Sequence, residues 1–284
     1  MSAVEETPTG VRTIDGVPTS VTALVGAASR GRSYRAVRIN SFSEFERRFG
    51  GLVSNYDLGY AVQQFFLNGG KDAWVVRVAR QLTATKVIKG IHALDAVDIF
   101  NLLVIPGVTN SEALSAAADY CRQRRAFLLL DAPRTAQTPT QMAQAVQNAT
   151  LPKTSYGAAY FPWIKIPNPL KRRELRLTPP SGSIAGLFAR TDNSGGVWKA
   201  PAGTDAALIG VSGLSYNLTD SENGALNALG INCLRIFPTG RLVCRIGNTF
   251  RCGDSHSSLK RAFIAKFNGQ SSSRTANLSG HRFG

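Results

Sequence analysis

The sequence has few of the residues on which metal and catalytic sites depend. Its 284 residues include 3 histidines and 4 cysteines, and no two cysteines have a C-x-x-C spacing. Zinc sites need closely spaced thiolates or imidazoles, so this pattern argues against a metal site and favours buried, reduced thiols. The residues concerned are His92, His256, His281, Cys121, Cys233, Cys244 and Cys252. We predict no metal ligands and no cofactor.

The common catalytic motifs are missing as well. The chain has no G-x-S-x-G elbow, no G-x-G-x-x-G turn and no G-x-x-x-x-G-K-[ST] phosphate loop. Asp131 ends the apolar run AFLLLD, at the kind of strand end where α/β enzymes place acids. No partner is visible for it, so we interpret it as a turn residue that hydrogen-bonds its own backbone. We predict that the protein is not an enzyme and has no catalytic residues.

A long hydrophobic run is also missing. The longest candidate, Ala126–Leu130, is far shorter than the roughly 18 residues that indicate a membrane span. The first ten residues, MSAVEETPTG, are acidic and polar, whereas a secretory signal has a basic start and an apolar centre. We therefore expect assembly in the cytoplasm and no membrane insertion.

Positive charge is abundant but unevenly distributed. The formal net charge is +15, yet residues 241–284 carry 8 Lys and Arg against 1 acidic residue, and residues 1–240 carry 25 against 17. Basic clusters occur at Arg30-Arg32-Arg35-Arg38, Arg122-Arg124-Arg125 and Lys171-Arg172-Arg173. Aromatic residues do not alternate with them as they do in single-strand nucleic-acid sites. A solvated face or charge-paired contacts between subunits is the preferred interpretation, and a nucleic-acid-binding protein remains an alternative.

Apolar runs alternate with amphipathic segments along most of the chain. Strands are predicted at 20–28, 73–79, 101–107, 126–133, 156–163, 206–218 and 231–237, with a further one near residue 38. Helices are predicted at 42–49, 58–68, 111–125, 139–149 and from 220, and residues 80–100 are ambiguous, with a weak helix at 91–96. Strands that alternate with helices of this length imply right-handed crossovers. The fold class is α/β with a doubly wound, mostly parallel sheet.

Several helix starts have capping signals. Ser41 with Glu44 and Thr109 with Glu112 have the spacing of capping boxes, and Thr138 precedes a proline at the first helical position. Asp57 or a neighbour is expected to cap the second helix.

The stretch Pro179–Pro201 is predicted to contain a helix between two extended segments. Two prolines enforce an extended entry, and a helix is expected to start at Ser181 or Ser183, since a hydroxyl can accept from the first turn. Gly195-Gly196 should end the helix, because glycine adopts left-handed backbone geometry without steric strain.

This stretch carries a family resemblance. PPSG, AGLFARTDNSGGVWKAPAG and GINCLRIFP resemble the core of tail sheath proteins of contractile phage tails and of related contractile injection particles. Further similar blocks are GVPTSVTALVGAASRG, SFSEFERRFGG, LGYAVQQFFLNGGKDAWVVRV and SYGAAYFPWIKIPNP. The blocks occur in the family's order and cover nearly the whole chain to about residue 240.

The resemblance implies a subtilisin-like sheath domain without subtilisin's catalysis. It also implies a structural subunit that forms six-subunit rings stacked helically around an inner tube protein, meets baseplate components and contracts to drive the tube through a target envelope. Such subunits add terminal arms as strands to a neighbour's sheet. Residues 1–18 resemble the N-terminal arm, with Val4, Val11, Ile14 and Val17 as subunit-contact candidates. The expected location is a virion tail or a phage-like injection particle, after assembly in the cytoplasm.

The C-terminal part departs from the family pattern. From about Gly240 the sequence is basic, Ser-rich and aperiodic, as a truncated or frameshifted end would be, and the strand at 231–237 is expected to remain an unprotected edge. We therefore predict poor assembly. The predicted segments are 1–18, an extended arm; 19–100, the N-terminal α/β part; 101–205, the core sheath domain; 206–240, the start of a C-terminal domain; and 241–284, a poorly ordered tail. A subtilisin-like hydrolase is the remaining alternative.

Overall fold

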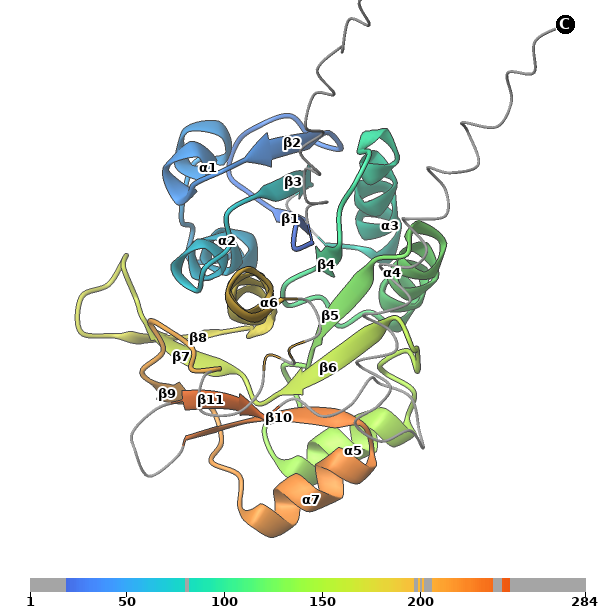
Figure 1. The fold of residues 1–284 in the computed structure, drawn as a ribbon, viewed down its shortest axis with the longest axis vertical. Helices are drawn as coiled ribbons and strands as arrows, with labels where there is room; N and C mark the ends of the chain where they lie inside the picture. The colour runs from blue at the N-terminus through green and yellow to red at the C-terminus, as the bar shows by residue number, and fades with distance from the viewer. Residues whose placement is uncertain are drawn as a thin grey trace, which may run out of the picture.

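The computed structural model describes residues 19–79, 82–196, 199, 201, 206–236 and 242–245, the last as backbone only. Its centre is an eight-stranded sheet in the order β11-β10-β6-β5-β4-β1-β3-β2 (Figure 1). The strands are β1 (Thr22–Ala27), β2 (Ala36–Ile39), β3 (Ala73–Val78), β4 (Leu102–Val104), β5 (Phe127–Asp131), β6 (Gly157–Phe161), β10 (Ile231–Ile236) and β11 (Leu242–Arg245).

The six central strands are parallel, and each of the two outer strands is antiparallel to its neighbour. Strands β3 and β2 lie on one side of β1. Strand β4 lies on the other side of β1, and β5, β6 and β10 follow it in that direction. A sheet wound in two directions has a switch point where ligands and active sites of α/β proteins gather, here between β1 and β4. The doubly wound, mostly parallel sheet that the sequence predicts is confirmed.

Helices cover both faces of the sheet (Figure 1). One face is covered by α1 (Phe42–Phe49), α2 (Asp57–Leu67) and α6 (Ser181–Gly195), and we call it the α2–α6 face. The other is covered by α3 (Ala84–His92), α4 (Ser111–Arg124), α5 (Pro139–Gln147) and α7 (Asp220–Ala228), and we call it the α3–α4 face. Each face has its own cluster of buried apolar side chains, as expected for strands that are buried on both sides. Within the described residues, no helix is both long and apolar enough to span a bilayer.

The N-terminal capping predictions hold in part. Thr138 forms a full capping box with Gln141, and Ser41 Oγ accepts from Glu44 N at 3.2 Å. The Glu44 carboxylate, however, accepts from Asn40 N and not from Ser41 N. The cap of α4 is Asn110, not Thr109, because the Asn110 side chain reaches Ala113 N at 2.9 Å.

Two element predictions are wrong, and one hairpin was not predicted. The ambiguous region contains the nine-residue helix α3 from Ala84, followed by a 3-10 turn, η1 (Ala93–Ala96), so the weak helix was placed too late. The expected strand at 206–218 is reduced to β9 (Gly213–Leu214), which joins β7 (Ile164–Pro167) and β8 (Leu175–Thr178) in a small sheet of order β8-β7-β9. The β7–β8 hairpin was not predicted, although both of its strands alternate apolar and basic residues, because each strand is only four residues long.

The strand β10 is not an unprotected edge. It pairs with β6 on one side, and β11 pairs antiparallel with it on the other, from Cys233 opposite Arg245 to Ile236 opposite Leu242. The prediction of an exposed edge at this strand is therefore wrong, because the chain after residue 241 still supplies a partner strand.

Candidate functional site

The polar groups at the carboxyl end of the parallel strands centre on Asp131. This residue ends β5 and is 4% exposed, and its carboxylate receives three hydrogen bonds. Ser181 N donates to Oδ1 at 2.9 Å, Ser181 Oγ to Oδ2 at 2.7 Å, and Gly107 N to Oδ2 at 3.3 Å. The interpretation of Asp131 as a self-bonding turn residue is wrong, since these three donors come from the β4–α4 loop and from the start of α6.

Burial dominates the electrostatics of this carboxyl group. It raises the pKa of Asp131 to about 7, against the opposing effect of the Ser181 and Gly107 hydrogen bonds, and the nearby Asp57 raises it further. The group therefore changes protonation near neutral pH while it holds two separate elements together.

Ser181 is the first residue of α6, as the sequence predicts, but for a different reason. The N-cap is Pro180, which has no capping side chain, and the Ser181 hydroxyl donates to Asp131 where the sequence argument expected it to accept. The Asp131 carboxylate from β5 accepts the free N–H of the first turn, and a negative group suits the positive end of a helix. The predicted end is confirmed, since the helix ends at Gly195 and Gly196 has φ of +79°.

A second acid, Asp57, lies next to this junction. It is the first residue of α2 and does not cap it; its Oδ1 accepts from Arg176 Nη2 at 2.8 Å. Arg176 also donates to Ser54 O at 2.6 Å and lies 3.9 Å from the centre of the Tyr60 ring. The network thus joins α2 to β8, and Thr178 at the end of β8 leads directly into α6.

Gly107 fits only as glycine. Its φ is +71°, and a Cβ at this position would lie 2.6 Å from Asp57 Oδ2. The close approach brings the loop between β4 and α4 against both acids, so the two carboxylates, the loop and the start of α6 form one structural unit at the switch point.

In a Ser-His-Asp triad the histidine lies between the serine and the aspartate, whereas here the Ser181 hydroxyl bonds the Asp131 carboxylate directly. His92 lies at the end of α3 on the opposite face, where its ring contacts Asp95 at 3.3 Å and its side chain is 58% exposed. His256 and His281 lie outside the described residues. Among the described side chains, Ser181 and Asp131 therefore act as a joint between elements, and the hydrolase alternative finds no support.

Metal-ligand clusters and reactive thiols are likewise not found in the described part of the chain. No group of three or more His, Cys, Asp or Glu side chains is placed to hold an ion there. Cys121 and Cys233 are buried free thiols, and burial raises the pKa of both, that of Cys233 to about 12. The prediction of buried, reduced thiols is confirmed for these two.

The basic clusters are used mostly within the chain. Arg38 pairs with Asp72 at 2.5 Å, Arg122 with Asp119 at 3.4 Å and Lys171 with Glu174 at 3.2 Å. Arg124 bonds the Val97 carbonyl and lies over the Phe100 ring. The predicted arm contacts Val4, Val11, Ile14 and Val17 lie outside the described residues, so they stay predictions.

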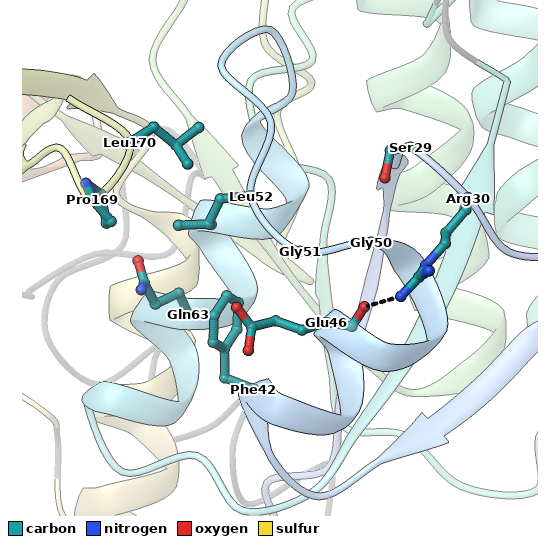
Figure 2. A pocket seen from close by; sticks show the side chains of 10 residues that line it. All are labelled: Ser29, Arg30, Phe42, Glu46, Gly50, Gly51, Leu52, Gln63, Pro169 and Leu170. Atoms are coloured by element: carbon teal, nitrogen blue, oxygen red, sulfur yellow. Dashed lines mark hydrogen bonds between the residues drawn. The ribbon is translucent and has the colours of Figure 1, made fainter.

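A surface hollow of about 560 Å³ lies between α1 and the β7–β8 hairpin (Figure 2). Its apolar wall comes from Phe42, Leu52, Pro169 and Leu170, and the Glu46 carboxylate lies beside the Phe42 ring (Figure 2). Arg30 bonds the Glu46 backbone carbonyl at 3.0 Å across its rim. The hollow is open to solvent and has one carboxylate, and its one hydroxyl, that of Ser29, donates to Phe49 O at 3.0 Å. This lining suits a contact with another protein better than a reaction.

The described residues form an α/β fold around a doubly wound, mostly parallel sheet. Three solved structures are similar in fold. The contracted helical sheath of the anti-feeding prophage is 23% identical, with a TM-score of 0.74 over 100% of this chain and 78% of that chain. The contracted sheath complex of the extracellular contractile injection system PVC is 23% identical (TM-score 0.73, over 99% of this chain and 78% of that chain), and the sheath tail protein from Listeria innocua is 10% identical (TM-score 0.62, over 92% and 80%). At these identities the likeness shows the fold.

Family membership follows from the sequence comparison. The model of the phage tail sheath protein central domain matches residues 80–244, which is more than half of the chain. The chain belongs to the phage tail sheath protein family. No curated protein matches it.

Proposed function

We propose that this chain is a structural subunit of a contractile tail sheath, which polymerises around an inner tube and contracts to drive it through a target envelope. The family match over residues 80–244 carries the proposal. The fold supports it, because it extends the likeness to sheaths of contractile particles over the whole chain.

The internal construction suits a subunit that moves as a rigid body. Contraction of a sheath rearranges contacts between subunits, so each subunit must keep its own shape while its surroundings change. Here the Asp131 joint ties β5, the β4–α4 loop and α6, and Arg176 ties β8 to α2. These hydrogen bonds support a role for the domain as a rigid unit.

The partners in the proposal are other copies of the chain in stacked six-subunit rings, the inner tube protein and baseplate components. Residues 1–18 are proposed as the arm that links copies, with Val4, Val11, Ile14 and Val17 as its apolar contacts. The segments 19–100, 101–205 and 206–240 are proposed as successive parts of the sheath body. Assembly in the cytoplasm precedes incorporation into a phage tail or a phage-like particle.

The test is self-assembly of the full chain. Purified protein is examined by sedimentation velocity over a range of concentrations and by negative-stain electron microscopy. Rings or helical tubes of regular diameter are expected. A chain that stays monomeric at every concentration contradicts the proposal and agrees with the prediction of poor assembly. The argument from an exposed edge at β10 no longer supports that prediction, since β11 pairs with β10.

A further inference from the structure

A smaller hollow lies between the β8-β7-β9 sheet and the segment that leads from β5 into α5. Its volume is about 320 Å³, and we call it the Trp163 hollow. Its apolar lining comes from Ala136, Trp163, Leu175 and Leu177, and its polar lining from Arg134, Gln137, Lys165 and Ser215. Concave surfaces of this kind, mostly apolar with a few polar groups, are where proteins bind ligands and short segments of partners.

The apolar side of the hollow follows from the alternation along β7 and β8. Lys165 lies opposite Leu177 in the ladder, and Leu175 is two residues before Leu177, so these three side chains share one face of the small sheet. The other face carries Ile164 and Ile166, which belong to the buried cluster of the α2–α6 face. Leu175 is 55% exposed. The small sheet therefore presents a partly exposed apolar surface to the hollow.

The walls of the hollow are held in place by hydrogen bonds. The Trp163 indole N–H donates to Ala132 O at 2.8 Å, and Ala132 N donates to Tyr160 O at 3.0 Å. Ser215 N donates to Trp163 O at 2.8 Å and fixes the β9 side. An ordered site loses little conformational entropy on binding, so its side chains are already arranged for a partner.

Two cations flank this apolar surface. The Arg134 guanidinium lies 5.4 Å from the centre of the Trp163 ring, which favours a cation–π contact. Neither Arg134 nor Lys165 forms an ion pair with any residue that the structure describes. Because arginine binds a carboxylate through two parallel hydrogen bonds, this arrangement is complementary to a carboxylate carried next to an apolar side chain.

We propose that the Trp163 hollow is a docking site for a segment of another protein in which a carboxylate stands beside a large apolar side chain. The C-terminal part of this chain is an unsuitable occupant, since residues 241–284 carry 8 Lys and Arg against 1 acidic residue and would be repelled by Arg134 and Lys165. An acidic partner is attracted, both by these two cations and by the net charge of +15.

The test uses the peptide acetyl-Leu-Glu-Leu-Glu-amide as the probe, and isothermal titration calorimetry on the full chain in low salt measures its affinity. The paired variant Arg134→Gln with Lys165→Gln should weaken binding by about 10-fold or more, because the carboxylates lose both cations. Leu175→Gln should weaken binding by about 3- to 10-fold, since the peptide no longer covers an apolar side chain. The matched control Arg47→Gln with Lys71→Gln removes two exposed charges elsewhere and should bind as the unaltered chain does.

Two further probes separate the possible occupants. Acetyl-Leu-Gln-Leu-Gln-amide has the same length without the charges and should bind at least about 10-fold more weakly. Equal affinity for the two peptides, or unchanged affinity of the paired variant, overturns the proposal. Binding of N-acetyl-leucine as tight as that of the acidic peptide would assign the hollow to a small carboxylic acid and also overturns it, as does the absence of binding at about 1 mM peptide. The altered side chains lie at the surface, so thermal unfolding of each variant should match that of the unaltered chain.

Discussion

The two faces of the sheet are held by different means. On the α2–α6 face, glycines bring backbone against backbone: a Cβ on Gly182 would lie 2.4 Å from Ala61 O, and one on Gly186 would lie 2.4 Å from Phe65 O. On the α3–α4 face, the tight glycine Gly90 approaches a side chain, Val78 Cγ1, at 2.3 Å. At these positions α6 is in main-chain contact with α2, whereas α3 contacts β3 through a side chain that can adjust.

The largest expected effect comes from filling these glycine positions. Gly182→Ala should lower the free energy of unfolding by about 3 kcal/mol or more, because helices α2 and α6 must separate. Gly90→Ala should cost less, about 1–2 kcal/mol, since Val78 can shift. Gly224→Ala in α7, where nothing lies within 4 Å of the added atom, should stabilise by about 0.5–1 kcal/mol. Urea unfolding gives the three values, and equal losses at Gly182 and Gly90 would refute the contrast between the faces.

The buried carboxyl group gives the α2–α6 face a pH dependence. The folded-state pKa of Asp131 is raised to about 7, above an unfolded value of about 3.9, so the folded protein holds this proton more tightly. Its stabilising contribution is complete below about pH 4 and is lost as the pH rises to about 7, a change on the order of 4 kcal/mol at most.

Comparison with Asp131→Asn isolates this effect. The free energy of unfolding of the unaltered chain, minus that of the variant, should fall between pH 4.5 and 7 and then level off. Urea titrations at half-unit pH steps measure it. A difference that is constant with pH, or that rises, would show that the three hydrogen bonds outweigh burial and that the carboxylate is ionised throughout.

Two ion pairs test burial on a smaller scale. Arg176 and Asp57 have side chains 14% and 19% exposed, whereas the Arg38 side chain is 58% exposed beside Asp72. Arg176→Met should cost about 1–3 kcal/mol, because it leaves a partly buried carboxylate unpaired. Arg38→Met should change stability by at most about 0.5 kcal/mol, since exposed pairs contribute little. Thermal unfolding at fixed pH compares them, and similar losses would remove burial as the explanation.

A further small effect is expected on the α3–α4 face, at a helix start that is set by a local hydrogen bond. Thr138→Ala removes the hydroxyl that accepts from Gln141 N at 3.3 Å and should destabilise by about 1 kcal/mol. Thr140→Ala in the first turn of the same helix serves as the control and should be nearly neutral. A loss at Thr140 equal to that at Thr138 would show that the cap contributes nothing specific.

The resemblance to the sheath family could be read from the sequence because it lies in ordered blocks, and the doubly wound sheet because apolar runs and helical stripes alternate. The blocks from Gly16 to Pro238 led to the family that the comparison shows. The predictions that failed concern short elements. The strands of the β7–β8 hairpin have four residues each, and α3 has only Val87 and Ile91 as large buried apolar residues.

By itself, the sequence determined the elements whose signals are local: the Thr138 cap, the end of α6 at Gly195, and the buried strands β4 and β5. Only the tertiary structure decided the role of Asp131, because its donors Gly107 and Ser181 are 24 and 50 positions away along the chain. It likewise decided which arginines remain unpaired, since Asp72 reaches Arg38 across the β2–β3 pair, and Arg32 and Arg35 meet only at the surface. Local propensity acts over a few residues, whereas hydrogen bonds and charge pairs across a sheet depend on how distant strands are ordered.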